Sequence, residues 1–157
     1  TFGVTLATKR TSAENVKASE AADKLVIEPY ANPFRVYPLV EDFNDFHQLL
    51  SKEGMECYII NTGAFLDKKV TKEVTLGSIE EIVEGNARFL PFGEVEGLSY
   101  MDVPGFNPDF SDRSYLKLVK ERMKMRLEYL ETFNKEHPEH PLPETSIEMV
   151  KNVMKSL

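Results

Sequence analysis

The sequence predicts an α/β protein of the mixed α+β kind, with one compact domain in which helices flank a small mixed sheet. Three observations support this class. Of the 157 residues, 41% are hydrophobic, which is enough for one core in a chain too short to suggest two. Short apolar runs end at proline, glycine or polar turns, as strands do. Longer stretches place apolar residues at helical spacing.

We expect a single domain over residues 1–157, made of three consecutive parts. Residues 1–24 are polar and alanine-rich after a short strand, so they form a loop or a weakly packed helix. Residues 25–110 contain the sheet and its helices, and residues 111–157 contain the carboxy-terminal helices.

Apolar runs mark expected strands over residues 4–8, 25–27, 34–37 and 56–60, and an alternating pattern marks a further one over residues 68–75. The strongest of these is residues 56–60, because a run rich in aromatic and β-branched side chains is typical of a central strand. Its Cys57 would then be a buried thiol. Residues 89–110 contain several prolines and glycines among aromatic side chains, so we expect an irregular packed segment with one or two strands.

Helical spacing predicts helices over residues 41–53, from Ser78 to about residue 84, over residues 111–135 and from Thr145 onward. Gly54 and Gly85 should end the first two helices, because glycine readily adopts the left-handed conformation found there. The prolines between residues 137 and 143 must separate the last two helices, since proline lacks the amide donor that a helix needs.

Composition limits the classes of partner. A net charge of −7 argues against nucleic acid, because the phosphate backbone is bound mainly by Lys and Arg. No apolar run approaches the roughly 20 residues that cross a bilayer, and no signal peptide opens the chain, so we expect a cytoplasmic protein without a membrane partner. Because the chain begins at Thr1 rather than Met, we expect its start to be a cut or a boundary within a longer protein.

The sequence contains no complete catalytic site. It has neither a P-loop nor a Gly-x-Gly-x-x-Gly motif. His137 and His140 are spaced like metal ligands, but they lie among prolines without a third ligand, so we expect a solvated loop there and no metal site. His47 falls within a predicted helix, where a structural role is favoured over a catalytic one.

Two basic pairs remain, and each lies beside an expected strand or turn. They are Lys9-Arg10 and Lys68-Lys69, and they could converge on one anionic ligand in this acidic chain. The alternative, which composition alone favours, is that these lysines only keep the surface soluble.

One ordered set of features resembles a known family. The set comprises Cys57 to Gly63 with its terminal Asn-Thr-Gly, then Lys68-Lys69-Val70, Thr75, Leu90-Pro91-Phe92 and Asp102 to Gly105. Over about residues 2–133 the chain resembles the carboxy-terminal part of ATP-dependent phosphoenolpyruvate carboxykinase. The resemblance implies that residues 1–24 form a mobile lid whose Arg10 neutralises charge as it closes. It also implies a nucleotide site bordered by Thr62, Gly63, Lys68, Lys69, Val70 and Thr75.

Such an enzyme converts oxaloacetate and ATP into phosphoenolpyruvate, carbon dioxide and ADP, using Mg²⁺ or Mn²⁺, at the entry to gluconeogenesis. In that family the P-loop and the metal ligands lie upstream of the matched region, so this chain would be the nucleotide-side portion and inactive alone. It departs from the family where Ala64 to Asp67 replace a glycine-rich loop and where Lys69 replaces an arginine. The alternatives are a non-catalytic nucleotide-binding module and an assembly module that uses the helix over residues 111–135.

Overall fold

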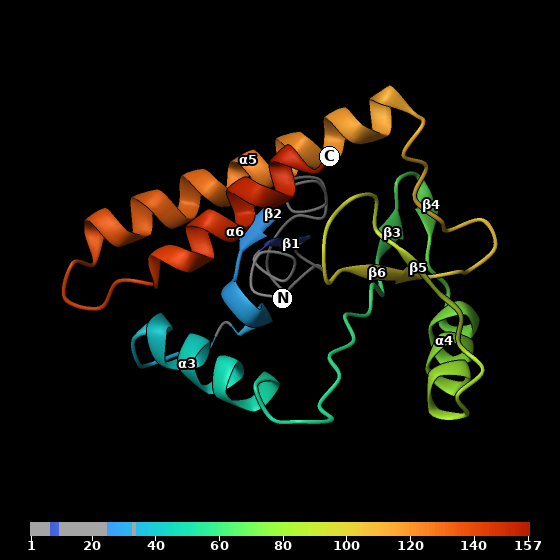
Figure 1. Ribbon diagram of the computed structural model, residues 1–157, viewed down its shortest axis with the longest axis horizontal. Coiled ribbons are helices and arrows are strands. Elements are labelled where there is room, and N and C mark those ends of the chain that lie inside the picture. The colour runs from blue at the N-terminus through green and yellow to red at the C-terminus, as the bar shows by residue number, and fades with distance from the viewer. Residues whose placement is uncertain (1–6, 10–24, 33) are drawn as a thin grey trace, which may run out of the picture. The chain divides into compact units, whose positions relative to one another are not determined.

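The computed structural model describes residues 7–9, 25–32 and 34–157, and within these ranges the protein is mixed α+β (Figure 1). The elements are β1 (Ala7–Lys9), β2 (Leu25–Ile27), the 3-10 helix η1 (Pro29–Ala31), α3 (Leu39–Leu50), β3 (Ala64–Phe65), β4 (Lys68–Lys69), α4 (Lys72–Val83), β5 (Phe89–Pro91), β6 (Ser99–Met101), α5 (Arg113–Glu136) and α6 (Glu144–Lys155). The described strands form three antiparallel pairs, β1 with β2, β3 with β4 and β5 with β6.

Contacts within the chain divide it into two units. The first unit contains Thr1–Ile59 and Lys124–Val150, and the second contains Ile60–Met123 and Lys151–Leu157.

The first unit is built on an apolar cluster of Leu39, Leu130, Leu142, Ile147 and Val150. Leu130 of α5 has no exposed surface and is among the most deeply buried side chains of the cluster. The Asn134 amide closes the α5–α6 turn, because it donates to the Leu142 carbonyl at 2.9 Å and accepts from the Leu142 amide at 2.8 Å. This side chain therefore satisfies both backbone polar groups of Leu142, whose own side chain is buried ahead of α6.

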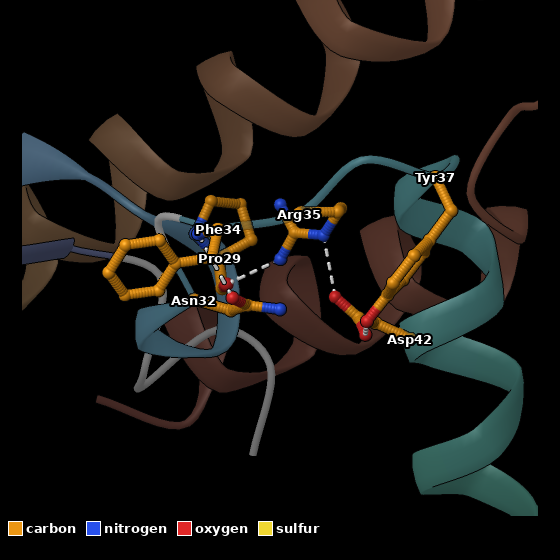
Figure 2. A network of polar contacts seen from close by, with 6 residues as sticks. All are labelled: Pro29, Asn32, Phe34, Arg35, Tyr37 and Asp42. Atoms are coloured by element: carbon orange, nitrogen blue, oxygen red, sulfur yellow. Dashed lines mark hydrogen bonds and ion pairs between the residues drawn. The ribbon is translucent and has the colours of Figure 1, made fainter.

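A polar network centred on Arg35 fixes the chain ahead of α3 (Figure 2). Arg35 Nε lies 2.6 Å from Asp42 Oδ2, and its Nη2 donates to the Pro29 carbonyl at 2.7 Å. The Tyr37 hydroxyl donates to the other oxygen of Asp42 at 2.7 Å. Because Arg35 turns inward, its apolar neighbours Phe34 and Val36 are 86% and 95% exposed. The network ties an irregular segment to the first turn of α3.

The second unit packs around aromatic rings. Phe110 meets Phe92 edge to face at a centroid distance of 5.0 Å and Tyr115 at 6.1 Å. Tyr115, at the start of α5, also contacts Phe65 of β3 at 6.2 Å. Tyr100 of β6 lies 6.4 Å from Phe110, so ring contacts join both strand pairs of this unit to the first turn of α5.

Several predicted elements are confirmed. The strand over residues 25–27 is present, and the helices over residues 41–53, 111–135 and from Thr145 correspond to α3, α5 and α6. Two strands lie within residues 89–110. Gly85 follows the C-cap of α4 with a left-handed φ of 74°, as predicted. Gly54 also has a positive φ, of 76°, but it does not end α3, which stops earlier at Leu50 with Ser51 as its C-cap. Residues 4–6 of the first predicted strand lie outside the described residues, while Ala7–Lys9 forms β1.

The prediction for residues 56–60 is wrong. No strand forms there, and the Tyr58, Ile59 and Ile60 side chains are exposed. Cys57 is an exposed thiol rather than a buried one. A run of β-forming residues becomes a strand only when a neighbouring strand supplies its hydrogen bonds, and the described strands pair with one another instead.

Three further expectations are corrected. Residues 68–75 do not form one strand, because the strand stops at Lys69 and Thr71 caps α4, whose start at Lys72 precedes the expected Ser78. Residues 34–37 are not a strand, since the Arg35 network holds them in an irregular path. The described strands form separate antiparallel pairs rather than one mixed sheet.

We expect Leu130→Ala to lower the free energy of unfolding by about 2–5 kcal/mol, because it opens a cavity in the first unit's core. The matched control is Leu118→Ala on the same helix, where the side chain is 46% exposed and the loss should stay within about 0.5 kcal/mol. Urea denaturation of both variants measures the two losses. Equal losses would contradict the assignment of Leu130 to the core.

The Asp42 carboxylate raises the pKa of Tyr37, chiefly through the hydrogen bond that the phenol donates. The pKa of Tyr37 is therefore higher in the folded protein than the ordinary 10.0 of an unfolded chain. The hydrogen bond from the protonated phenol stabilises the fold fully below pH 10, and this stabilisation is lost as the pH rises through the folded-state pKa. We therefore expect Asp42→Asn to lower the pKa of Tyr37. An NMR titration that follows the chemical shifts of the tyrosine ring carbons measures this pKa. Tyr58 is the internal control, since its raised pKa depends on Glu56 and should not move.

Candidate functional site

The Asn-Thr-Gly turn of the second unit is held by its own asparagine. Asn61 Oδ1 accepts from the Gly63 amide at 3.0 Å, and Asn61 Nδ2 donates to the Ala64 carbonyl at 2.9 Å. Asparagine favours such turns because its short side chain reaches backbone groups two or three residues on. The turn therefore has a fixed path into β3.

A backbone hydrogen bond joins this turn to the segment after the basic pair. The Val70 amide donates to the Gly63 carbonyl at 3.0 Å. Between these two residues, β3 and β4 pair with Ala64 opposite Lys69 and Phe65 opposite Lys68. Leu66 begins the connecting turn with a left-handed φ of 54°, which a non-glycine residue adopts only at some cost.

Helix α4 begins directly after the hairpin. Thr71 caps it, with its hydroxyl accepting from the Val74 amide at 3.4 Å. The Thr75 hydroxyl donates to the Thr71 carbonyl at 3.1 Å. A hydroxyl has one donor and two acceptor lone pairs, so Thr75 can still accept a hydrogen bond from a ligand.

An open hollow of about 250 Å³ lies at the tip of the hairpin, lined by Phe65, Leu66, Asp67, Lys68, Gly105 and Asn107. Its far wall is the loop over residues 102–107, in which Asn107 donates to Asp102 at 2.6 Å and accepts from the Val103 amide at 2.9 Å. Across the hollow, Lys68 Nζ donates to the Gly105 carbonyl at 3.1 Å.

The residues that the sequence assigned to a nucleotide site all lie in the second unit. They belong to the Asn-Thr-Gly turn, the β3–β4 hairpin with the residue after it, and the first turn of α4; they are Thr62, Gly63, Lys68, Lys69, Val70 and Thr75. Lys69 and Thr62 are exposed, whereas Val70 is only 8% exposed and packs inside the unit. Arg10 lies outside the described residues, and of the predicted lid over residues 1–24 the structure describes only β1.

The structure adds two groups that the sequence did not assign to the site. Asn107 organises the loop that meets Lys68, and the Gly105 carbonyl provides the contact. The signal available in the sequence was the Val103-Pro104-Gly105-Phe106-Asn107 run, since proline and glycine mark a turn whose asparagine can bond its own backbone. Nothing local in that run indicates that Lys68 is its partner.

The remaining candidates stay at the surface. Within the described ranges, no group of three His, Cys, Asp or Glu side chains is placed to hold a metal ion. His137 and His140 are exposed in the turn between α5 and α6, and His47 is exposed on α3. Of the helices that the structure describes, none is long and apolar enough to span a membrane.

Comparison with known proteins identifies no relative of the chain. No family model matches it, and neither a curated protein nor a solved structure does. The hairpin and its surroundings are therefore the physical basis for inferring a function.

We expect Asn61→Ala to loosen the hairpin, because the Gly63 amide and the Ala64 carbonyl lose their side-chain partner. Amide hydrogen exchange at Val70, which donates to Gly63, should quicken by about fivefold, the equivalent of one net hydrogen bond. The control is Asn86→Ala, which removes only a contact with Glu84 at 3.1 Å and should leave Val70 unchanged. Equal exchange at Val70 in all three proteins would show that Asn61 does not support the hairpin.

Proposed function

We propose that the chain is the carboxy-terminal, nucleotide-side portion of an ATP-type phosphoenolpyruvate carboxykinase, a cytoplasmic lyase acting on oxaloacetate. The observation that carries the proposal is the bond from the Val70 amide to the Gly63 carbonyl. It brings the Asn-Thr-Gly turn, the basic pair and the start of α4 together within one unit. These are the segments that the carboxykinase resemblance assigns to the nucleotide.

Each group has a chemical task in this proposal. The exposed Lys69 ammonium supplies positive charge and hydrogen-bond donors to the nucleotide, as lysine does at phosphate and ribose sites. Thr62 and Gly63 border the ribose, and the Thr75 hydroxyl accepts a further hydrogen bond. Val70 supports this surface from within the unit.

Phosphoryl transfer itself belongs to groups outside this chain. A divalent metal stabilises charge at the transferred phosphoryl group, and a P-loop positions it. In the proposed enzyme both lie upstream, while Arg10 neutralises charge when the lid closes. The chain's own contribution is to hold and orient the nucleotide, so we expect weak or undetectable ATP binding by this chain alone.

A second candidate is an assembly module, and one observation favours it. Leu76, Ile79 and Val83 follow one another at helical spacing along α4, and all three are exposed. An exposed apolar stripe on a helix often marks a protein contact. An assembly module predicts no effect of Lys69 on nucleotide, which separates it from the first proposal.

The test uses a protein that also carries the upstream P-loop and metal ligands. In that protein we expect Lys69→Ala to raise the nucleotide KM by about tenfold, which corresponds to the free energy of one charge-assisted hydrogen bond. The value of kcat should change less, because the contact is made equally in the ground and transition states. Lys120→Ala is the control, since Lys120 is an exposed lysine of α5 in the same unit. An unchanged nucleotide KM in Lys69→Ala would contradict the assignment of Lys69 to the nucleotide site.

A further inference from the structure

The two lysines of the basic pair lie on opposite faces of the β3–β4 hairpin. Residues directly opposite each other in an antiparallel pair share a face, and successive residues alternate. Phe65 is opposite Lys68, so these two share one face, while Ala64 and Lys69 share the other. Adjacent positions in sequence are therefore not equivalent in space.

The face with Phe65 is turned toward the unit's interior. Phe65 contacts the Tyr115 ring at 6.2 Å, and Val70, two residues beyond Lys68 and hence on the same side, is buried. Lys68 lies on this same face; its side chain is exposed, and its ammonium reaches the Gly105 carbonyl at 3.1 Å.

Hydrogen bonds also hold the loop over residues 102–107, which Lys68 contacts. The Phe106 amide donates to the Val103 carbonyl at 2.9 Å, and the Asp102 amide donates to the Arg88 carbonyl at 2.8 Å. Asn107 bonds to Asp102 and to the Val103 amide, as described above. The Gly105 carbonyl is thus presented from a loop with several internal hydrogen bonds, and Lys68 links that loop to the hairpin.

Lys69 faces the other way. Its side chain lies beside Ala64 and is exposed, as that of Lys68 is too, so the two lysines differ in their contacts and not in exposure. Lys68 donates to Gly105, whereas the Lys69 ammonium makes neither a hydrogen bond nor an ion pair within the described part of the chain.

We infer that the basic pair is divided between two tasks: Lys68 is a positioning residue that fastens the hairpin to the Gly105 loop, and Lys69 alone presents its charge to an anion. That the anion is a nucleotide phosphate or ribose-linked group rests on the proposed function. The division of tasks rests only on the hairpin register and the Lys68 contact.

Competitive acetylation of the full chain tests this division without any ligand. An amine held by a carbonyl must leave that contact before it can react, so Lys68 should be acetylated about fivefold more slowly than Lys69, as read by peptide mass spectrometry. Asn107→Leu removes the hydrogen bonds that Asn107 makes with Asp102 and Val103, and in this variant the acetylation rates of the two lysines should converge. Equal rates in the unaltered chain would overturn the inference.

Amide NMR provides the second measurement, with a conservative variant as rescue. Lys68→Met should move the Phe106 amide signal, since that amide belongs to the same peptide unit as the Gly105 carbonyl, and Lys68→Arg should restore it. Lys69→Met should leave it in place. A Phe106 signal that moves equally in Lys68→Met and Lys69→Met would overturn the division.

The two proposals fail separately. If Lys69→Met leaves the nucleotide KM of the P-loop-containing protein unchanged while Lys68 remains the slowly acetylated lysine, the proposed function fails and the positioning role of Lys68 stands. If the KM rises in Lys69→Met but both lysines are acetylated equally, the nucleotide proposal stands and the positioning role is lost.

Discussion

The hydrogen bond from the Val70 amide to the Gly63 carbonyl sets the geometry of the second unit. It closes the hairpin, and a closed hairpin of fixed register decides which side chains point inward. Val70 is then buried and Lys68 contacts the Gly105 loop, while Lys69 lies on the opposite face of the hairpin; both lysines remain exposed. The strand also ends early enough for Thr71 to start α4.

Local signals in the sequence were sufficient for α3, α5 and α6. The apolar spacing of these helices is a property of each segment alone, and the prolines beside their ends act through their own backbone preferences. The Asn-Thr-Gly turn belongs to the same group, because the bonds from Asn61 reach only two and three residues along the chain. Predictions of this kind need no knowledge of distant contacts.

Strands and contacts over long sequence separations could not be predicted in the same way. The β-forming run at residues 56–60 has the composition of a strand, but composition does not name the partner that a strand requires. Residues 68–75 have an alternating strand pattern, but the strand ends at Lys69 and Thr71 caps α4. A capped helix offers this segment more hydrogen bonds than a strand that continued past the hairpin. The approach of Lys68 to Gly105 spans 37 positions and depends on how the hairpin folds. The basic pair was thus identified from sequence, but the different environments of its two lysines were not.

The exposed Cys57 thiol has a practical consequence. It is the only cysteine in the sequence, and it precedes the Asn-Thr-Gly turn by four positions. A thiol-reactive fluorophore or spin label would therefore attach at one defined place, close along the chain to the hairpin, with no background cysteines to remove. The feature that most contradicts the sequence pattern thus offers a single reporter position from which motion of the turn can be observed.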